Sequence, residues 1–146
     1  MFRKIPLSNL WLIGIVLLAI DRIVKYFFSL VSEPLGWDML NFGLNKNTNI
    51  FLNLNLDQSL SVIIMAVVLI FIIFVLWSFK NQSPYFLLSA VFILVGGVSN
   101  LFDRLFFGYV IDYINLGRII VFNLSDIFIV TGALGIIYFY KKLNVV

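Results

Sequence analysis

Four apolar segments, separated by polar connections, dominate the pattern of this chain. The second segment, residues 60–79, contains no charged side chain. Its length matches the roughly 20 residues that a helix needs to cross a bilayer. The other three segments cover residues 8–29, 84–102 and 119–140. Because lipid offers the backbone no hydrogen-bond partners, helices are the predicted form of all four.

The first segment allows a second interpretation. Arg3 and Lys4 followed by an apolar block are also typical of a cleavable secretory signal. The block, however, continues into the polar run at residues 21–25 instead of a small-residue cleavage site. We therefore expect an uncleaved spanning helix.

The connection over residues 31–59 is long and polar, and it predicts a further element. Residues 52–56 read Leu-Asn-Leu-Asn-Leu, a strict alternation that is typical of a strand. The predicted fold is an all-α membrane protein, a single domain over residues 1–146. It has four transmembrane helices and a small extracytoplasmic β-rich loop domain.

Composition agrees with a membrane protein, since 62% of the residues are apolar and 12% are charged. A soluble domain of this size exposes too much of its surface to hide so many apolar side chains. The chain has no Cys and no His, which excludes thiolate chemistry, a Ser-His-Asp triad and a His-based zinc site. The bases are scattered, so nucleic acid is not an expected partner.

Membrane orientation does not follow from the bases alone. With both termini on one side, each side of the membrane carries five Lys and Arg residues. The acids all fall on the side opposite the termini, where they can pair with the bases. The bases at the termini, Arg3-Lys4 and Lys141-Lys142, form clusters without acids. This difference favours cytoplasmic termini.

Three acids, Asp21, Asp103 and Asp126, fall in the spanning segments or at their ends. Ionisable residues there are costly, and a functional role is the default interpretation. Alternate threading puts Asp103 at the outer end of the third helix. It puts Asp126 about two turns into the fourth helix from the same side, so these two acids can meet.

Both of these acids follow an Asn by three residues, Asn100 and Asn123. Residues three apart share a helix face, so each amide is expected one turn from its acid, where it can donate to the carboxylate. Two carboxyl groups close together do not easily both ionise. One then takes a proton from water while the other polarises a carbonyl, which is the chemistry of an aspartic peptidase.

Purely structural roles for these charged residues also remain open at this point. The two acids can be neutralised by Arg104, Arg118 or Lys25 in an inert cluster, although Arg104 is better placed to pair with Asp112. Asp21 and Lys25 are spaced as an ordinary i, i+4 ion pair.

Other functions also remain open. Ser29 follows Lys25 by four residues, which allows a Ser-Lys dyad. The whole chain can also be a small ion-coupled transporter, although such proteins favour midplane acids and internal repeats. A catalytically lapsed homologue of an enzyme is the third alternative.

The motifs resemble those of the lipoprotein signal peptidase (signal peptidase II) family. Its Asp-x-x-x-Lys motif is matched by Asp21 and Lys25. Its Gly-Asn-x-x-Asp-Arg motif is similar to residues 99–104, with Ser99 in place of Gly.

Two later motifs extend the resemblance along the chain. Gly-x-Val-x-Asp-Phe is matched by residues 108–113, with Tyr in place of Phe. Phe-Asn-x-Ala-Asp is matched by residues 122–126, with Ser in place of Ala. The family's Asn-x-Gly-x-Ala-Phe corresponds to residues 47–52, where only Asn47 is retained and Phe51 takes the Ala position.

The resemblance implies an intramembrane aspartic endopeptidase that removes signal peptides from diacylglyceryl-modified prolipoproteins by cutting before the lipidated Cys. It implies a site near the outer face of the bacterial cytoplasmic membrane, surrounded by membrane lipids, with no metal or organic cofactor and with inhibition by globomycin-type peptides. It assigns catalysis to Asp103 and Asp126. The implied supporting or substrate-contacting residues are Asn47, Asn100, Arg104, Asn123, Asp21, Lys25 and Asp112.

Overall fold

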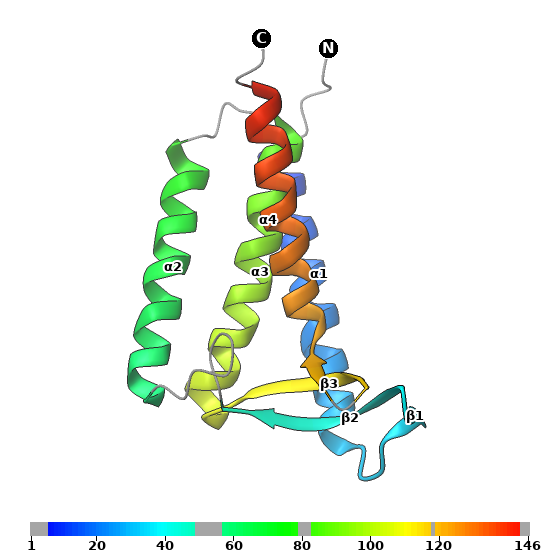
Figure 1. Cartoon of the computed structure of the whole chain (residues 1–146). Helices are drawn as coiled ribbons and strands as arrows, with labels where there is room; N and C mark the ends of the chain where they lie inside the picture. The colour runs from blue at the N-terminus through cyan, green and yellow to red at the C-terminus, as the bar shows by residue number, and fades with distance from the viewer. Residues whose placement is uncertain (1–5, 49–56, 79–82, 118, 144–146) are drawn as a thin grey trace.

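A computed structural model describes residues 6–48, 57–78, 83–117 and 119–143. The four helices are α1 (Leu7–Leu30), α2 (Gln58–Ser78), α3 (Pro84–Phe107) and α4 (Leu124–Leu143). The four strands are β1 (Leu35–Trp37), β2 (Leu40–Asn47), β3 (Val110–Leu116) and β4 (Ile120–Phe122). The helices run side by side, and the strands gather at the end of the molecule opposite the described chain ends (Figure 1).

Two of the predicted helix boundaries are wrong. The third helix continues past residue 102 to Phe107, where Gly108 adopts a φ of 80° and its N–H bonds to the Arg104 carbonyl oxygen at 3.1 Å. Glycine reaches this left-handed conformation without steric cost, which makes it a common helix end. The fourth helix begins at Leu124 and not at residue 119, because the preceding apolar residues form β4.

The strands form one antiparallel sheet in the order β1-β2-β3-β4. Phe42 on β2 lies opposite Ile114 on β3, and Asn47 lies opposite Val110 at the far end of the same pair. A small sheet is therefore confirmed, but half of it comes from the connection between α3 and α4, for which no strand was predicted. The alternating residues 52–56 lie outside the described residues.

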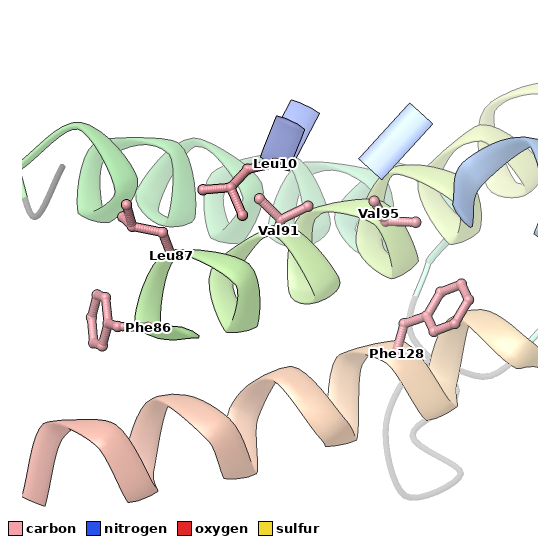
Figure 2. Packing of buried hydrophobic residues seen from close by; sticks show 6 residues of the cluster. All are labelled: Leu10, Phe86, Leu87, Val91, Val95 and Phe128. Carbon is pink, nitrogen blue, oxygen red and sulfur yellow. The ribbon is translucent and has the colours of Figure 1, made fainter. Parts of the chain in front are cut away.

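Helix α3 is the centre of the bundle and packs against α1, α2 and α4. Close approach to α4 depends on glycine, since a Cβ on Gly132 would lie 2.7 Å from a side-chain carbon of Ile93. Small residues allow the backbones of two helices to approach in this way. A cluster of buried apolar side chains lies between these helices (Figure 2). Its buried members are Leu10, Phe86, Leu87, Val91, Val95 and Phe128.

Two of the described helices, α2 and α3, are long and apolar enough to cross a membrane, whereas the apolar part of α4 is shorter, at residues 124–139. Only 11% of the apolar stretch of α2 is buried inside the protein, compared with 61% of that of α3. Large apolar side chains on α1 are exposed too, including Trp11 and Ile23. Such outward apolar faces suit lipid as the surrounding solvent.

Candidate active site

The start of α4 fixes Asp126 through reciprocal hydrogen bonds. Asn123 precedes the helix, and its Oδ1 accepts a bond from the Asp126 backbone N–H at 3.0 Å. In return, the Asn123 backbone N–H donates to Asp126 Oδ2 at 3.1 Å. This arrangement is the geometry of a capping box, which satisfies donors that the first turn of a helix leaves free. Asp126 is thus the third residue of α4, and the prediction of two turns into the helix was wrong because β4 occupies those residues.

Asp103 projects from α3 into the interface with α1 and is fully buried. Its Oδ1 accepts a hydrogen bond from Arg22 at 2.6 Å, and its Oδ2 accepts one from Lys25 at 2.8 Å. The backbone N–H of Ile111, at the start of β3, adds a third bond to Oδ2 at 3.2 Å. Two cations and a backbone amide therefore surround this carboxylate.

Asn100 connects the two acids. Its side-chain amide donates to Asp126 Oδ1 at 2.9 Å, and its Oδ1 accepts from Lys25 at 2.7 Å. Since Lys25 also binds Asp103, a continuous path of hydrogen bonds runs from one carboxyl group to the other. The prediction that each side-chain amide donates to the acid three residues later is therefore wrong for both residues. Asn100 donates to the acid of the other helix, and Asn123 reaches the Asp126 carboxylate through its backbone N–H, while its side-chain amide donates to Asp112.

Asp112 lies on β3 and is held by two amides. Asn47 Nδ2 donates to its Oδ2 at 2.7 Å, and Asn123 Nδ2 donates to its Oδ1 at 2.6 Å. Burial raises the pKa of Asp112 to about 6, and the two amide hydrogen bonds act in the opposite direction. The sheet thereby brings Asn47 of β2 into the same network.

The ion pair of Asp21 and Lys25 is confirmed at 3.6 Å, but it is not a simple surface pair. Both side chains are fully buried, and Lys25 forms its shorter bonds with Asp103 and Asn100 on α3. Asp21 accepts a hydrogen bond from the Ser99 hydroxyl. Ser29 instead donates to the Tyr26 carbonyl oxygen at 2.7 Å, so the geometry gives no support to a Ser-Lys dyad.

Arg104 is buried in the last turn of α3. Its guanidinium donates to the Thr48 carbonyl oxygen at 3.4 Å. Asp112, Asp103 and Asp126 are the acids in its electrostatic surroundings. The pairing of Arg104 with Asp112 stays a prediction.

A cleft of about 310 Å³ opens beside Asp126. Its walls are apolar residues of α2, α3 and α4, among them Val68, Ile93 and Ile129, and its polar end contains Asn100 and Asp126. A predominantly apolar cleft with a few convergent polar groups is the usual form of a ligand site. Its other polar lining residues are Asn47, Arg104 and Asp112.

Two residues of this network were not among the predicted site residues, Arg22 and Ser99. Arg22 donates to Asp103, and it also donates to the Ser99 carbonyl and hydroxyl oxygens at 3.3 and 3.1 Å. The only signal in the sequence was the position of Arg22 between Asp21 and Lys25, within an otherwise apolar segment. Among the described residues, no group of three or more acids, His or Cys is arranged to hold a metal ion.

Comparison with known proteins finds relatives that match most of the chain. The family model described as signal peptidase (SPase) II matches residues 13–141. The lipoprotein signal peptidase of Chlorobaculum parvum is 29% identical over 154 aligned residues, which cover 91% of this chain and 95% of that protein. The lipoprotein signal peptidase of Bartonella henselae is 34% identical, with 87% of this chain and 85% of that protein covered.

Solved structures agree with this fold. One bacterial membrane enzyme, determined at 2.3 Å resolution, superposes with a TM-score of 0.82 at 20% identity, covering 97% of this chain and 93% of the other. A second, at 1.9 Å resolution, gives a TM-score of 0.79 at 19% identity, covering 94% of this chain and 96% of the other. Together with the sequence matches, which extend along nearly the whole chain, these findings show that the protein belongs to the signal peptidase II family.

Proposed function

We propose that this chain is an intramembrane aspartic endopeptidase that removes signal peptides from diacylglyceryl-modified prolipoproteins, cutting just before the lipidated Cys. Asp112 and Asp126 are the catalytic pair, in place of the predicted Asp103 and Asp126, because Asp103 is fully buried in ion pairs with Arg22 and Lys25 and does not line the cleft. The observation that carries this proposal is that both acids line the polar end of the apolar cleft and that Asn123 holds them both, through its side-chain amide to Asp112 and its backbone N–H to Asp126. Membership of the signal peptidase II family supplies the reaction class.

The chemistry requires one proton on the pair. The ionised carboxyl group takes a proton from a water molecule, whose oxygen attacks the scissile carbonyl carbon. The protonated carboxyl group gives its proton to the carbonyl oxygen, and a tetrahedral intermediate forms. When the C–N bond breaks, a proton passes from the pair to the leaving nitrogen, and a second transfer restores the starting state. No metal ion or organic cofactor takes part.

The cleft suits a lipidated, apolar substrate. Its apolar walls, from residues such as Val68 and Ile129, match the apolar part of a signal peptide. Asn47 and Arg104 also lie at the polar end, where they support the catalytic pair or contact the substrate backbone. We expect globomycin-type peptides to inhibit by occupying the same cleft.

The proposed topology has four spanning helices in the bacterial cytoplasmic membrane, with both termini in the cytoplasm and the site near the outer face. Helix α1, with 24 residues, extends about 36 Å, which is enough to cross the hydrocarbon core. The polar network lies at the sheet end of the helices. A transporter would favour acids near the middle of its helices, whereas Asp126 is in the first turn of α4.

A gel-shift assay in detergent tests the proposal. Purified protein is incubated with a diacylglyceryl-modified prolipoprotein and, in parallel, with its unlipidated form. The expected result is loss of the signal peptide from the lipidated form alone, with the new N-terminus at the modified Cys. A folded protein that binds the lipidated substrate without cleaving it would contradict the proposal and indicate a lapsed homologue.

A further inference from the structure

Lys25 is a buried cation beside the site, and in the described part of the chain no ion pair or hydrogen bond joins it to either proposed catalytic acid. Its ammonium group lies between α1 and α3, 2.8 Å from Asp103 Oδ2 and 3.6 Å from Asp21 Oδ2. A third acceptor, Asn100 Oδ1, lies closer than either, at 2.7 Å. The shortest bond of this cation therefore goes to a neutral amide.

The Asn100 amide has one orientation that satisfies its neighbours. Its Oδ1 accepts hydrogen bonds from Lys25 and, at 3.2 Å, from the Asn123 side-chain amide. An ammonium group has donors and no acceptor, so a rotated Asn100 amide would place donor against donor at both neighbours. The Nδ2 group of Asn100 must therefore point the other way, and it donates to Asp126 Oδ1 at 2.9 Å.

The Asn123 amide is oriented in a similar way. Its Oδ1 accepts from the Asp126 backbone N–H at 3.0 Å, so its Nδ2 is turned towards Asp112 Oδ1, which lies at 2.6 Å. The same Nδ2 reaches Asn100 Oδ1. The two side-chain amides thus both present donors to the proposed catalytic acids, and Lys25 holds the outer end of this chain of bonds.

The orientation of Asn100 decides what Asp126 meets at its Oδ1. A donor bonded to a carboxylate favours the ionised form, whereas an amide oxygen at the same place would oppose it. The other bond of Asp126, from the Asn123 backbone N–H to Oδ2, does not depend on Asn100. The Asn100 amide is therefore a separate means of adjusting one acid of the pair.

The titratable groups around Lys25 and Asp126 come from α1, α3 and β3, since α2 contains none. The charged side chain of β2, Lys46, lies over the Tyr109 ring instead. The surrounding groups are Asp21, Asp103, Arg104, Asp112 and Tyr113.

We propose that Lys25 is a positioning residue, which fixes the Asn100 amide so that its N–H group and not its oxygen faces Asp126. This inference rests on the proposed function. It gives the buried cation of α1 a task in catalysis without contact with substrate. The influence of Lys25 on the acid pair passes through the amide.

The test is a cycle of variants, measured as pH profiles of kcat/KM for cleavage of a diacylglyceryl-modified prolipoprotein. Lys25→Met/Asp21→Asn is compared with Asp21→Asn, so that the two proteins differ only at Lys25. Without the ammonium group the amide can rotate, and one limb of the profile should move to higher pH by about one unit, as expected when a carboxylate loses a hydrogen bond. The two acids titrate as a pair, so the shift belongs to the pair.

The same comparison is then made in the Asn100→Leu background. Leu is close to Asn in size and has no donor, so the limb should already lie at higher pH, and loss of Lys25 should add no further shift. Such non-additivity indicates that two residues act through one contact. Lys46→Gln removes an equal charge from the exposed side chain of β2 and should leave the profile unchanged.

A conservative variant separates the hydrogen bond from the charge. Lys25→Gln/Asp21→Asn keeps a donor for the Asn100 oxygen and should restore most of the profile of Asp21→Asn. If Lys25→Met/Asp21→Asn does not fold, this variant decides, because a limb that moves although the donor is present would refute the inference.

Two further outcomes would overturn the inference. An equal shift with Asn100 and with Leu at this position would show that the charge of Lys25 acts directly on the acid pair. An unmoved profile in Lys25→Met/Asp21→Asn would leave Lys25 a purely structural role. Where Asn100→Leu cleaves too slowly for a profile, the cycle is read from the titration of the carboxyl-carbon NMR signal of Asp126, assigned by its absence from Asp126→Asn.

Failure of this inference is distinct from failure of the proposed function. Asp112→Asn and Asp126→Asn are measured in parallel with the Lys25 variants. Near-normal cleavage by either would refute the aspartic mechanism itself, whatever the Lys25 profiles. Loss of cleavage in both, with an unmoved profile in Lys25→Met/Asp21→Asn, would refute only the role of Lys25.

Discussion

Replacing Lys25 by Met should destabilise the protein strongly, although the two side chains have similar length. The Lys25 ammonium is fully buried between α1 and α3. It lies 2.8 Å from Asp103 Oδ2, 2.7 Å from Asn100 Oδ1 and 3.6 Å from Asp21 Oδ2. Its removal leaves two fully buried carboxylates with Arg22 as their remaining ion-pair partner in the described structure.

The magnitude follows from the burial of these groups. Removing one partner of a buried ion pair costs about 3–5 kcal/mol, because the other charge remains buried and uncompensated. Arg22 continues to neutralise Asp103, so we expect the lower end, about 3 kcal/mol. The double variant Lys25→Met/Asp21→Asn restores the charge balance of the cluster. It should therefore recover a large part of the lost stability.

Reversible unfolding in mixed detergent micelles, followed by circular dichroism, measures this effect. Lys46→Met is the matched control, since this exposed side chain should change the free energy of unfolding by no more than about 0.5 kcal/mol. The reasoning is refuted if Lys25→Met is no less stable than Lys46→Met. It is also refuted if the double variant is no more stable than Lys25→Met alone.

Three further predictions concern the start of α4 and the sheet. Asn123→Ala should lower the free energy of unfolding by about 1 kcal/mol because it removes the helix cap, whereas Asn123→Ser should keep the cap. Both variants should cleave more slowly, because neither side chain retains the amide that binds Asp112. Unfolding and initial rates of cleavage, measured on both variants, separate these two effects, and equal stability would contradict the cap. Ser125→Ala should stabilise the protein by about 1 kcal/mol, because this buried hydroxyl has no hydrogen-bond partner among the described residues. The control is Ser61→Ala, which removes a hydroxyl bonded to the Gln58 carbonyl oxygen and should destabilise the protein in the same unfolding assay. Burial raises the pKa of Asp112 from its ordinary 3.8 to about 6, so the folded state binds this proton more tightly than the unfolded state does. The free energy of unfolding should therefore fall as pH rises from about 4 to about 6. Asp112→Asn should lack this part of the pH dependence, and an unfolding free-energy difference from the wild type that is equal at pH 4 and pH 7 would contradict the shift.

The long, periodic elements of the fold could be predicted from the sequence, whereas the start of α4 could not. The apolar residues 119–122 stand only one residue before the fourth helix, so hydropathy alone does not separate strand from helix there. Ile120–Phe122 becomes a strand because Ile114 on β3 lies opposite Phe122 and provides the backbone partners. Such pairing is a tertiary effect that local pattern does not contain.

The candidate site was predictable as a set of residues but not as a set of contacts. Spacing along one helix identifies the i, i+4 pair of Asp21 and Lys25, and the structure confirms it. The shorter bond from Lys25 to Asp103 and that from Arg22 join residues far apart in the sequence. They depend on how α1 packs against α3, which a single sequence does not specify.

The central claim, that Asp112 and Asp126 form the catalytic pair, is tested most directly by single-turnover cleavage with each acid replaced by Asn. Both variants should remain folded and bind the lipidated prolipoprotein. Each should cleave at least about 10²-fold more slowly than the wild type, the contribution expected of general acid-base groups. Near-normal cleavage by either folded variant would contradict the account.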